Sequence, residues 1–181
     1  GPQFLVIDNR TRSLEEQATG FANVEEAASL LAGWQWQENA FQRFESDAVT
    51  DAGAPVEKVD ISLTRFTSAG DAAAAMPYFL EDREITLGQG EFSNPSLIGD
   101  ESRGINGFYH GYYDVTIYTR SGPLLLRVSA ASATGSPSAS PESIAREIVS
   151  RGMGLWQQAP PSETAVPNSV MAYLPESMSV A

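Results

Sequence analysis

The sequence contains no cysteine and only one histidine, His110. The missing thiols exclude disulfide bonds, thiolate metal sites and cysteine nucleophiles. A serine triad would have to use His110 as its base, but no Gly-x-Ser-x-Gly elbow accompanies it. Gly88-Gln-Gly90 lacks the third glycine and the helix of a dinucleotide-binding loop, and the acidic residues around Gly53 have the wrong spacing for a calcium loop. We therefore predict no catalytic residue, no cofactor and no metal site.

The sequence also lacks a long apolar run. The longest uncharged apolar stretch, residues 72–80, includes a proline and is far shorter than the roughly 20 residues that a membrane-spanning helix needs. We therefore expect no transmembrane segment. A hydrophobic content of 42% over 181 residues is sufficient for a folded domain with its own core.

Positive charge is scarce in this chain. Its 11 Lys and Arg residues, of which only Lys58 is a lysine, stand against 23 Asp and Glu residues, for a formal net charge of −12. The acidic residues are scattered along the sequence and form no tail. Because phosphate backbones would be repelled on average, we do not expect a nucleic-acid partner.

The first two residues, Gly1 and Pro2, match the remnant that a common tag-removing protease leaves. We interpret residues 1–2 as a tag-cleavage scar and expect the native N-terminus to be missing. The lack of cysteine suits either the cytosol or the exterior of a bacterium that does not rely on disulfides.

Alternating apolar and polar residues predict strands, and cap residues followed by an apolar face predict helices. A short buried strand is expected at residues 4–8, and further strands are expected at 34–44 (with a bulge between Trp36 and Phe41), 59–64, 113–119 and 124–130. Helices are expected after Ser13, Asn23, Ser68 and Ser140, with Pro77 kinking or splitting the third. The glycine-rich stretch 88–106 is expected to be a long connection with at most one short strand, near Ile85 or Leu97. The order β-α-β-β-α-β-β-α predicts an α+β fold, an antiparallel sheet with helices packed on it.

The domain assignment follows from these elements. Residues 3–158 are assigned to a single α+β domain. Residues 159–181 begin as a proline-rich connector, and 170–174 repeats the apolar pattern of 4–7, which predicts a terminal strand. This strand either begins a second repeat of a tandem array or adds to the edge of the sheet.

Three segments carry a resemblance to a known group of proteins: Ile98-Gly-Asp-Glu-Ser-Arg103, Leu125-Leu-x-Val-Ser129 and Ala145-Arg-x-Ile-Val-Ser-Arg151. Residues 21–152 resemble secreted or lipid-anchored bacterial proteins with a PsbP-like α/β sandwich. None of these motifs is catalytic. The resemblance implies an extracytoplasmic binding or accessory module that is secreted, periplasmic or at the cell surface.

An aromatic segment is the most unusual local feature. Phe108-Tyr-His-Gly-Tyr-Tyr113 holds five aromatic rings in six residues. Tyrosine and histidine combine a flat apolar body with a polar tip, so Phe108, Tyr109, His110 and Tyr112 are taken as candidate ligand-binding or partner-binding residues. The neighbouring glycines indicate a close approach or a sharp turn. An ordinary core strand is the alternative interpretation.

The main functional hypothesis is an extracytoplasmic, non-catalytic module that binds a protein, peptide or saccharide surface through the aromatic segment. One alternative is a carbohydrate-active or other hydrolase using a carboxylate pair, since 23 acidic residues leave such a pair open. Another is a structural unit of a tandem-repeat array. No sequence pattern indicates an oligomeric state.

Overall fold

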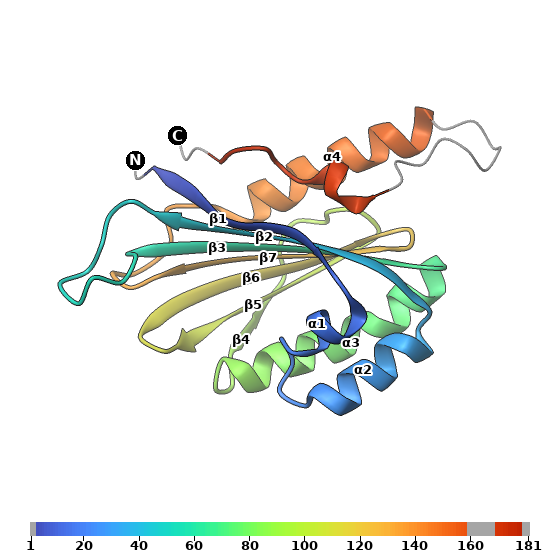
Figure 1. The fold of residues 1–181 in the computed structure, drawn as a ribbon, viewed down its shortest axis with the longest axis horizontal. Helices are drawn as coiled ribbons and strands as arrows, with labels where there is room; N and C mark the ends of the chain where they lie inside the picture. The colour runs from blue at the N-terminus through green and yellow to red at the C-terminus, as the bar shows by residue number, and fades with distance from the viewer. Residues whose placement is uncertain (1–2, 159–168, 179–181) are drawn as a thin grey trace.

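A single antiparallel sheet forms the centre of the molecule (Figure 1). The structure, a computed structural model, describes residues 3–158 and 169–178, with the side chains of residues 153–158 left out. Seven strands follow the order β1-β2-β3-β7-β6-β5-β4. They are β1 (Phe4–Arg12), β2 (Trp36–Ser46), β3 (Glu57–Phe66), β4 (Glu91–Ser93), β5 (Glu101–Tyr109), β6 (Tyr112–Ser121) and β7 (Leu124–Ser132). Every strand pair in this sheet is antiparallel.

Helices pack on both faces of the sheet, which confirms the predicted α+β fold (Figure 1). One face carries α1 (Leu14–Ala18), α2 (Val24–Gly33) and α3 (Ala69–Thr86), and the other carries α4 (Pro141–Gln158) and the 3-10 helix η1 (Val170–Tyr173). The expected caps begin the helices. The side chains of Ser13, Asn23, Ser68 and Ser140 each accept a hydrogen bond from the backbone amide three residues later, which satisfies an otherwise free helix donor.

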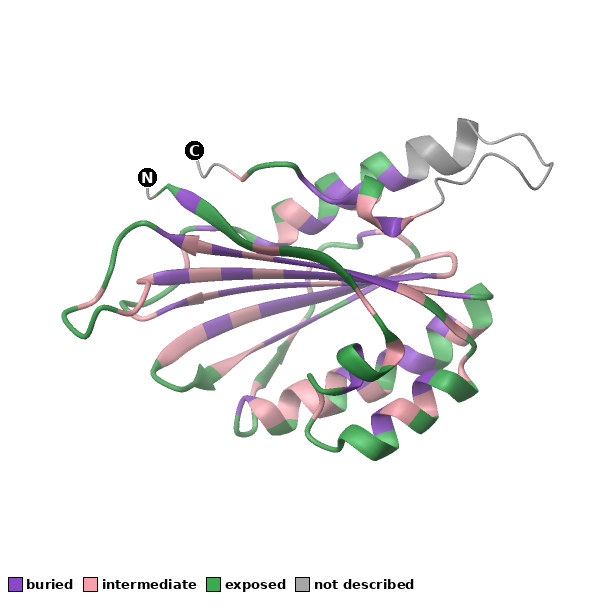
Figure 2. Cartoon of the chain, viewed as in Figure 1, coloured by how far each residue is buried: buried purple, intermediate pink, exposed green. Residues whose placement is uncertain are grey.

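Two apolar cores lie on the two faces of the sheet, because successive strand residues point to opposite faces. The core under α4 and η1 includes Phe44, Val59, Ile61, Leu126, Val128 and Ile148. The core under α1–α3 includes Leu31, Phe66, Met76, Phe79, Tyr118 and Leu125. Figure 2 shows the alternation of buried and less buried positions along the central strands. The predicted hairpin is confirmed as β6 and β7, and the predicted bulge in β2 falls between Trp36 and Glu38.

The predicted long connection at 88–106 is wrong in its second half, which forms most of strand β5. Glycines hide this strand in the sequence because they interrupt its apolar alternation. They are required by packing: a Cβ at Gly104 would lie 2.1 Å from Ser93 Oγ of β4, and one at Gly107 would lie 2.8 Å from Leu87 Cβ. Small residues here let the backbone of β5 approach β4 and the end of α3.

Two further expectations need correction. The first strand was expected to be buried, but β1 is an edge strand on which Leu5, Val6 and Ile7 are exposed (Figure 2). Of the two effects predicted for Pro77, a kink or a split, the split does not occur, since α3 is continuous from Ala69 to Thr86. Pro77 and Ala73, whose carbonyl loses its helical donor at Pro77, both lie on the exposed side of α3, where water can replace the missing bond.

The predicted terminal strand is also wrong. Residues 170–173 form η1, and Val170 and Tyr173 are buried in the core under α4. Ser169 Oγ donates a hydrogen bond to Glu38, and Gln42 Nε2 donates to the carbonyl of Pro175. Apolar residues at 170 and 173 share one face of a helical turn, a spacing that a short strand cannot use. The second-repeat hypothesis stays a prediction, and residues 159–168 lie outside the described part of the chain.

Candidate functional site

A cleft of about 380 Å³ lies next to the sheet on the α1–α3 side. It opens where the helices stop covering the sheet, beyond the apolar contacts that Phe79 of α3 makes with the strands. The residues that carry its chemistry are Arg12, Phe41, Arg43, Lys58, Asp60, Arg83, Tyr109, His110, Tyr112, Asp114, Arg127 and Ser129. A volume of this size falls in the range of small-molecule sites.

Small side chains on β7 form the floor of this cleft. Ser129 and Ala131 lie between the longer Asp60 and Lys58 of β3 on one side and Asp114 of β6 on the other. All five point to the same face of the sheet, since paired residues in an antiparallel ladder share a face. The low floor between longer neighbours therefore follows directly from the register of β3, β7 and β6.

Two arginine–aspartate pairs hold the walls in place. Arg43 donates from Nε and Nη2 to the two oxygens of Asp60 at 2.8 Å each. Arg83 of α3 donates from Nη2 to Asp114 Oδ2 at 2.7 Å and from Nε to Thr116 Oγ1 at 3.2 Å. Such paired guanidinium–carboxylate contacts fix the orientation of both partners.

The opposite charges in these pairs shift the pKa values of Asp60 and Arg83. Burial alone would raise the pKa of Asp60, but the hydrogen bond from Arg43 and the charges of Arg127 and Arg43 lower that pKa below its ordinary value. Burial likewise works against the charged form of Arg83, yet Asp114 raises the pKa of Arg83 above its ordinary value. Each pair is therefore an ion pair at neutral pH, with no net charge of its own.

A hydroxyl network continues from this wall to the floor. Thr116 Oγ1 donates to Asp114 Oδ1 at 2.6 Å and lies 2.8 Å from Ser129 Oγ. Thr116 has a single hydroxyl proton, so Ser129 is the donor in the second contact. The lone pairs of Ser129 therefore stay available on the floor of the cleft.

Three cations in the cleft have no acidic partner. Eight of the 11 Lys and Arg residues form ion pairs within the described residues. The other three, Arg12, Lys58 and Arg127, have none there, and all three line the cleft. Positive charge without a partner is thus concentrated at one place on a chain whose formal net charge is −12.

Neutral contacts hold two of these cations. Arg12 donates to Asn39 Oδ1 at 2.7 Å and to Ser62 Oγ at 3.0 Å, and its guanidinium lies 4.4 Å from the centre of the Phe41 ring. Lys58 Nζ lies 4.6 Å from the centre of the Tyr112 ring. Cation–π contacts fix the position of a charge without neutralising it.

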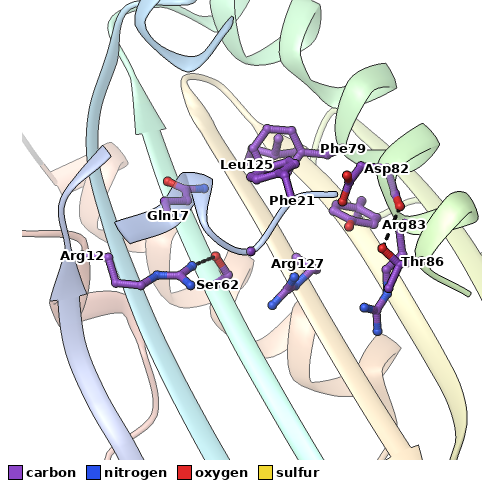
Figure 3. A pocket seen from close by; sticks show the side chains of 12 residues that line it. Arg12, Gln17, Phe21, Ser62, Phe79, Asp82, Arg83, Thr86, Leu125 and Arg127 are labelled. Atoms are coloured by element: carbon purple, nitrogen blue, oxygen red, sulfur yellow. Dashed lines mark hydrogen bonds between the residues drawn. The ribbon is translucent and has the colours of Figure 1, made fainter. Parts of the chain in front are cut away.

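Arg127 lies in the middle of the β-sheet, at the inner end of the cleft (Figure 3). Its Nε is buried without a hydrogen-bond partner among the described residues. Burial, together with the nearby charge of Arg127, lowers the pKa of Arg12 to about 10. Two arginines thus face one space, and the charge of Arg127 disfavours the charged form of Arg12.

That space is a small inner pocket of about 40 Å³. Figure 3 shows Arg12 and Ser62 on one side of it, Arg83 and Thr86 of α3 on the other, and Arg127 between them. The inner pocket shares Arg12, Arg83 and Arg127 with the cleft, so the two form one continuous site. It has room for a single polar group, while the cleft can hold the body of a ligand.

The structure divides the aromatic segment between the two faces of the sheet. Tyr109, His110 and Tyr112 line the cleft, whereas Phe108 lies on the opposite face against the ring of Tyr113 and is 71% exposed. His110 and Gly111 form the tight turn of the β5–β6 hairpin, with φ of 49° and 83°. Three of the four predicted residues therefore belong to the site, and their role in binding stays a prediction.

Sequence reasoning missed the charged residues of the cleft. Arg127 and Ser129 alternate with the core residues Leu126 and Val128, a pattern that normally indicates a solvated face. One signal could have found them. Arg127 shares its strand face with small residues, whereas the neighbouring strands carry longer polar side chains on that face. Within the described residues, no three acidic or histidine side chains come together as a metal site would require.

Comparisons with known proteins add little to this geometry. The chain matches no protein-family model and no curated protein. Among solved structures, it is similar to the extracellular domain of PknH from Mycobacterium tuberculosis, with a TM-score of 0.49 and 9% sequence identity over 83% of each chain. This likeness concerns the fold alone and carries no argument about function. No helix in the described part of the chain is long and apolar enough to cross a membrane.

Proposed function

We propose that this protein is an extracytoplasmic binding module whose cleft holds a small anionic ligand. The observation that carries the proposal is the gathering of Arg12, Lys58 and Arg127 without acidic partners among the residues that the structure describes. Buried or half-buried cations are normally paired, because an unpaired charge loses hydration without compensation. An anion entering the cleft would supply the missing partner.

The net charge of the whole chain favours a small anionic ligand over a long one. A surface with a net charge of −12 repels long polyanions, whereas the cleft presents local positive charge inside a concavity. A small anion can enter this cavity without lying along the acidic surface. The proposal therefore concerns small carboxylates or phosphate esters and agrees with the expectation that nucleic acid is not a partner.

The aromatic residues give the cleft a second kind of contact. Tyr109 and Tyr112 stand at its outer end, and the Tyr112 hydroxyl donates to the carbonyl of Pro55 at 2.6 Å, which fixes that ring. A rigid aromatic ring beside hydrogen-bond acceptors can bind sugars and flat apolar groups. Within the broader prediction of a protein, peptide or saccharide surface, these contacts favour a saccharide.

A hydrolase acting through two carboxylates is supported less well by this geometry. A general acid must carry a proton near neutral pH, which requires a raised pKa. The pKa of Asp60 is instead lowered, and Asp114 is held by Arg83. The extracytoplasmic location rests on the predicted PsbP-like resemblance, which remains a prediction.

Isothermal titration calorimetry with fructose, fructose 6-phosphate, galacturonate and inorganic phosphate tests the proposal. We expect the anionic compounds to bind and fructose to bind far more weakly. Arg127→Gln should weaken anion binding by about tenfold, the value of a charge-assisted hydrogen bond. The matched control is Arg146→Gln, which removes an exposed arginine on α4 and should leave binding unchanged. Equal binding of fructose, or equal losses in both variants, would overturn the proposal.

A further inference from the structure

We infer that the ligand carries two anionic groups, one held by Arg12 and Arg127 and the other by Lys58, with hydroxyl groups between them. This inference rests on the proposed function and names the class of ligand. Its basis is the position of the three unpaired cations along the sheet.

The three cations fall into two groups. Arg12 donates to Ser62, which is the register partner of Arg127 on the neighbouring strand. Both arginines line the inner pocket, and Lys58 does not. Lys58 is instead the register partner of Ala131 and lies under the Tyr112 ring, toward the hairpin tip. One positive centre is therefore at the inner end of the site and one at the outer end.

The register gives the distance between the two centres. Ala131 and Arg127 are four residues apart on β7, so their backbone positions are separated by about 13 Å at roughly 3.3 Å per residue. Strand side chains stand roughly perpendicular to the sheet, so the anionic groups they hold would be on the order of 10 Å apart. One carboxylate or one phosphate cannot span this distance.

The two centres differ in the group that suits them. A pair of planar guanidiniums presents several donors to one carboxylate or phosphate, and the inner pocket has room for only such a group. The ammonium of Lys58 is a point charge that accepts any anionic oxygen. Glu45 is the cross-strand neighbour of Lys58, but it forms no ion pair with Lys58 and does not line the cleft.

The floor between the centres presents hydrogen-bond acceptors. Ser129 has free lone pairs, and each oxygen of Asp60 accepts one bond from Arg43 and can accept another. Ser129 and Asp60 thus present hydrogen-bond acceptors midway between the two positive centres, where they can bind the hydroxyl groups of a sugar. The ligand class is therefore a sugar with two anionic substituents, such as a sugar bisphosphate or a short acidic oligosaccharide.

Two matched series distinguish phosphate from carboxylate as the anionic group. The phosphate series is fructose, fructose 6-phosphate and fructose 1,6-bisphosphate, and the carboxylate series is galacturonate and trigalacturonate. In at least one series we expect calorimetry to give an affinity about tenfold higher for the compound with more than one anionic group, since it gains one charge-assisted contact.

Lys58→Gln should remove that gain while leaving the binding of the compound with one anionic group unaffected, and Lys58→Arg should retain the gain. Arg127→Gln should weaken the binding of every anion. Equal affinities within both series, or an equal loss for all compounds in Lys58→Gln, would overturn the inference and leave the proposed function standing. If no anion of either series binds, both fail. Thermal melting of each variant confirms that the fold is retained.

Discussion

The two faces of strand β7 differ in chemistry although they share one backbone. Leu126 and Val128 point into the core under α4, where both are almost completely buried. Arg127 and Ser129, their direct neighbours, point into the cleft. On the first face α4 and η1 cover the apolar side chains of the central strands, whereas on the second α1–α3 leave part of the sheet uncovered (Figure 1).

This difference shows that the extent of helix cover decides what an alternating strand does. Polar residues on an uncovered sheet face are simply solvated. The same residues beside a helix that stops short become the wall and floor of a cavity. In this protein the partial cover keeps Arg12 and Arg127 half-buried and close together, and that arrangement gives the site its charge.

The largest effect is expected when a core position of β7 receives a charged side chain, like those on the cleft face of the same strand. Leu126→Asp places an unpaired carboxylate in the core and should destabilise the protein by about 4 kcal/mol or more. Urea denaturation followed by circular dichroism measures the free energy of unfolding. If this variant melted near the wild-type temperature, the assignment of this face as core would be wrong.

A smaller loss is expected from the wall of the cleft. Asp114→Ala removes the acidic partner of Arg83, whose side chain is only 16% exposed, and should cost about 3 kcal/mol because a buried cation is left unpaired. Glu142→Ala removes the exposed partner of Arg146 on α4 and should cost less than about 1 kcal/mol. Equal losses in the two variants would show that the cleft wall is no more structured than the surface.

Arg127→Gln should change stability by less than about 1 kcal/mol, with the change toward greater stability. The substitution removes a half-buried cation that has no partner among the described residues. It should also raise the pKa of Arg12, which Arg127 helps to lower to about 10. Chemical denaturation at neutral pH measures the stability, and a clear destabilisation would mean that Arg127 has a structural role.

The smallest expected effect concerns Asp82 in the inner pocket, and it depends on pH. Burial raises the pKa of Asp82, so the native state disfavours the ionised carboxylate. This penalty is present above the raised pKa and disappears below the ordinary value, where Asp82 is protonated in both the folded and unfolded states. Asp82→Asn should therefore stabilise the protein by less than about 1 kcal/mol at neutral pH and by nothing at low pH. Denaturation curves at pH 7 and pH 3 check the sign.

Much of the fold could be predicted from the sequence because local signals dominate it. The caps at Ser13, Asn23 and Ser68 and the alternation in β3, β6 and β7 specify most elements. The misses have physical causes. Glycines required by close packing concealed β5, and the burial of Val170 in η1 depends on contacts with a distant part of the chain.

The site was only partly predictable. The aromatic segment is conspicuous because its residues are consecutive, and three of its residues line the cleft. Arg12, Lys58 and Arg127 come from three different strands, and the register of the sheet alone brings them together. A missing acidic partner is likewise a property of three-dimensional neighbours, so no sequence pattern could reveal it.

The most direct test of the central claim is to observe the arginine Nε–H groups by nuclear magnetic resonance during titration with fructose 6-phosphate. We expect the largest shifts at Arg127, whose Nε has no hydrogen-bond partner among the described residues, and at Arg12. Arg146 and Arg151 on α4 serve as internal controls and should not move. Shifts confined to these exposed arginines, or no shift at Arg127 under saturating ligand, would show that the cations of the cleft do not bind the anion.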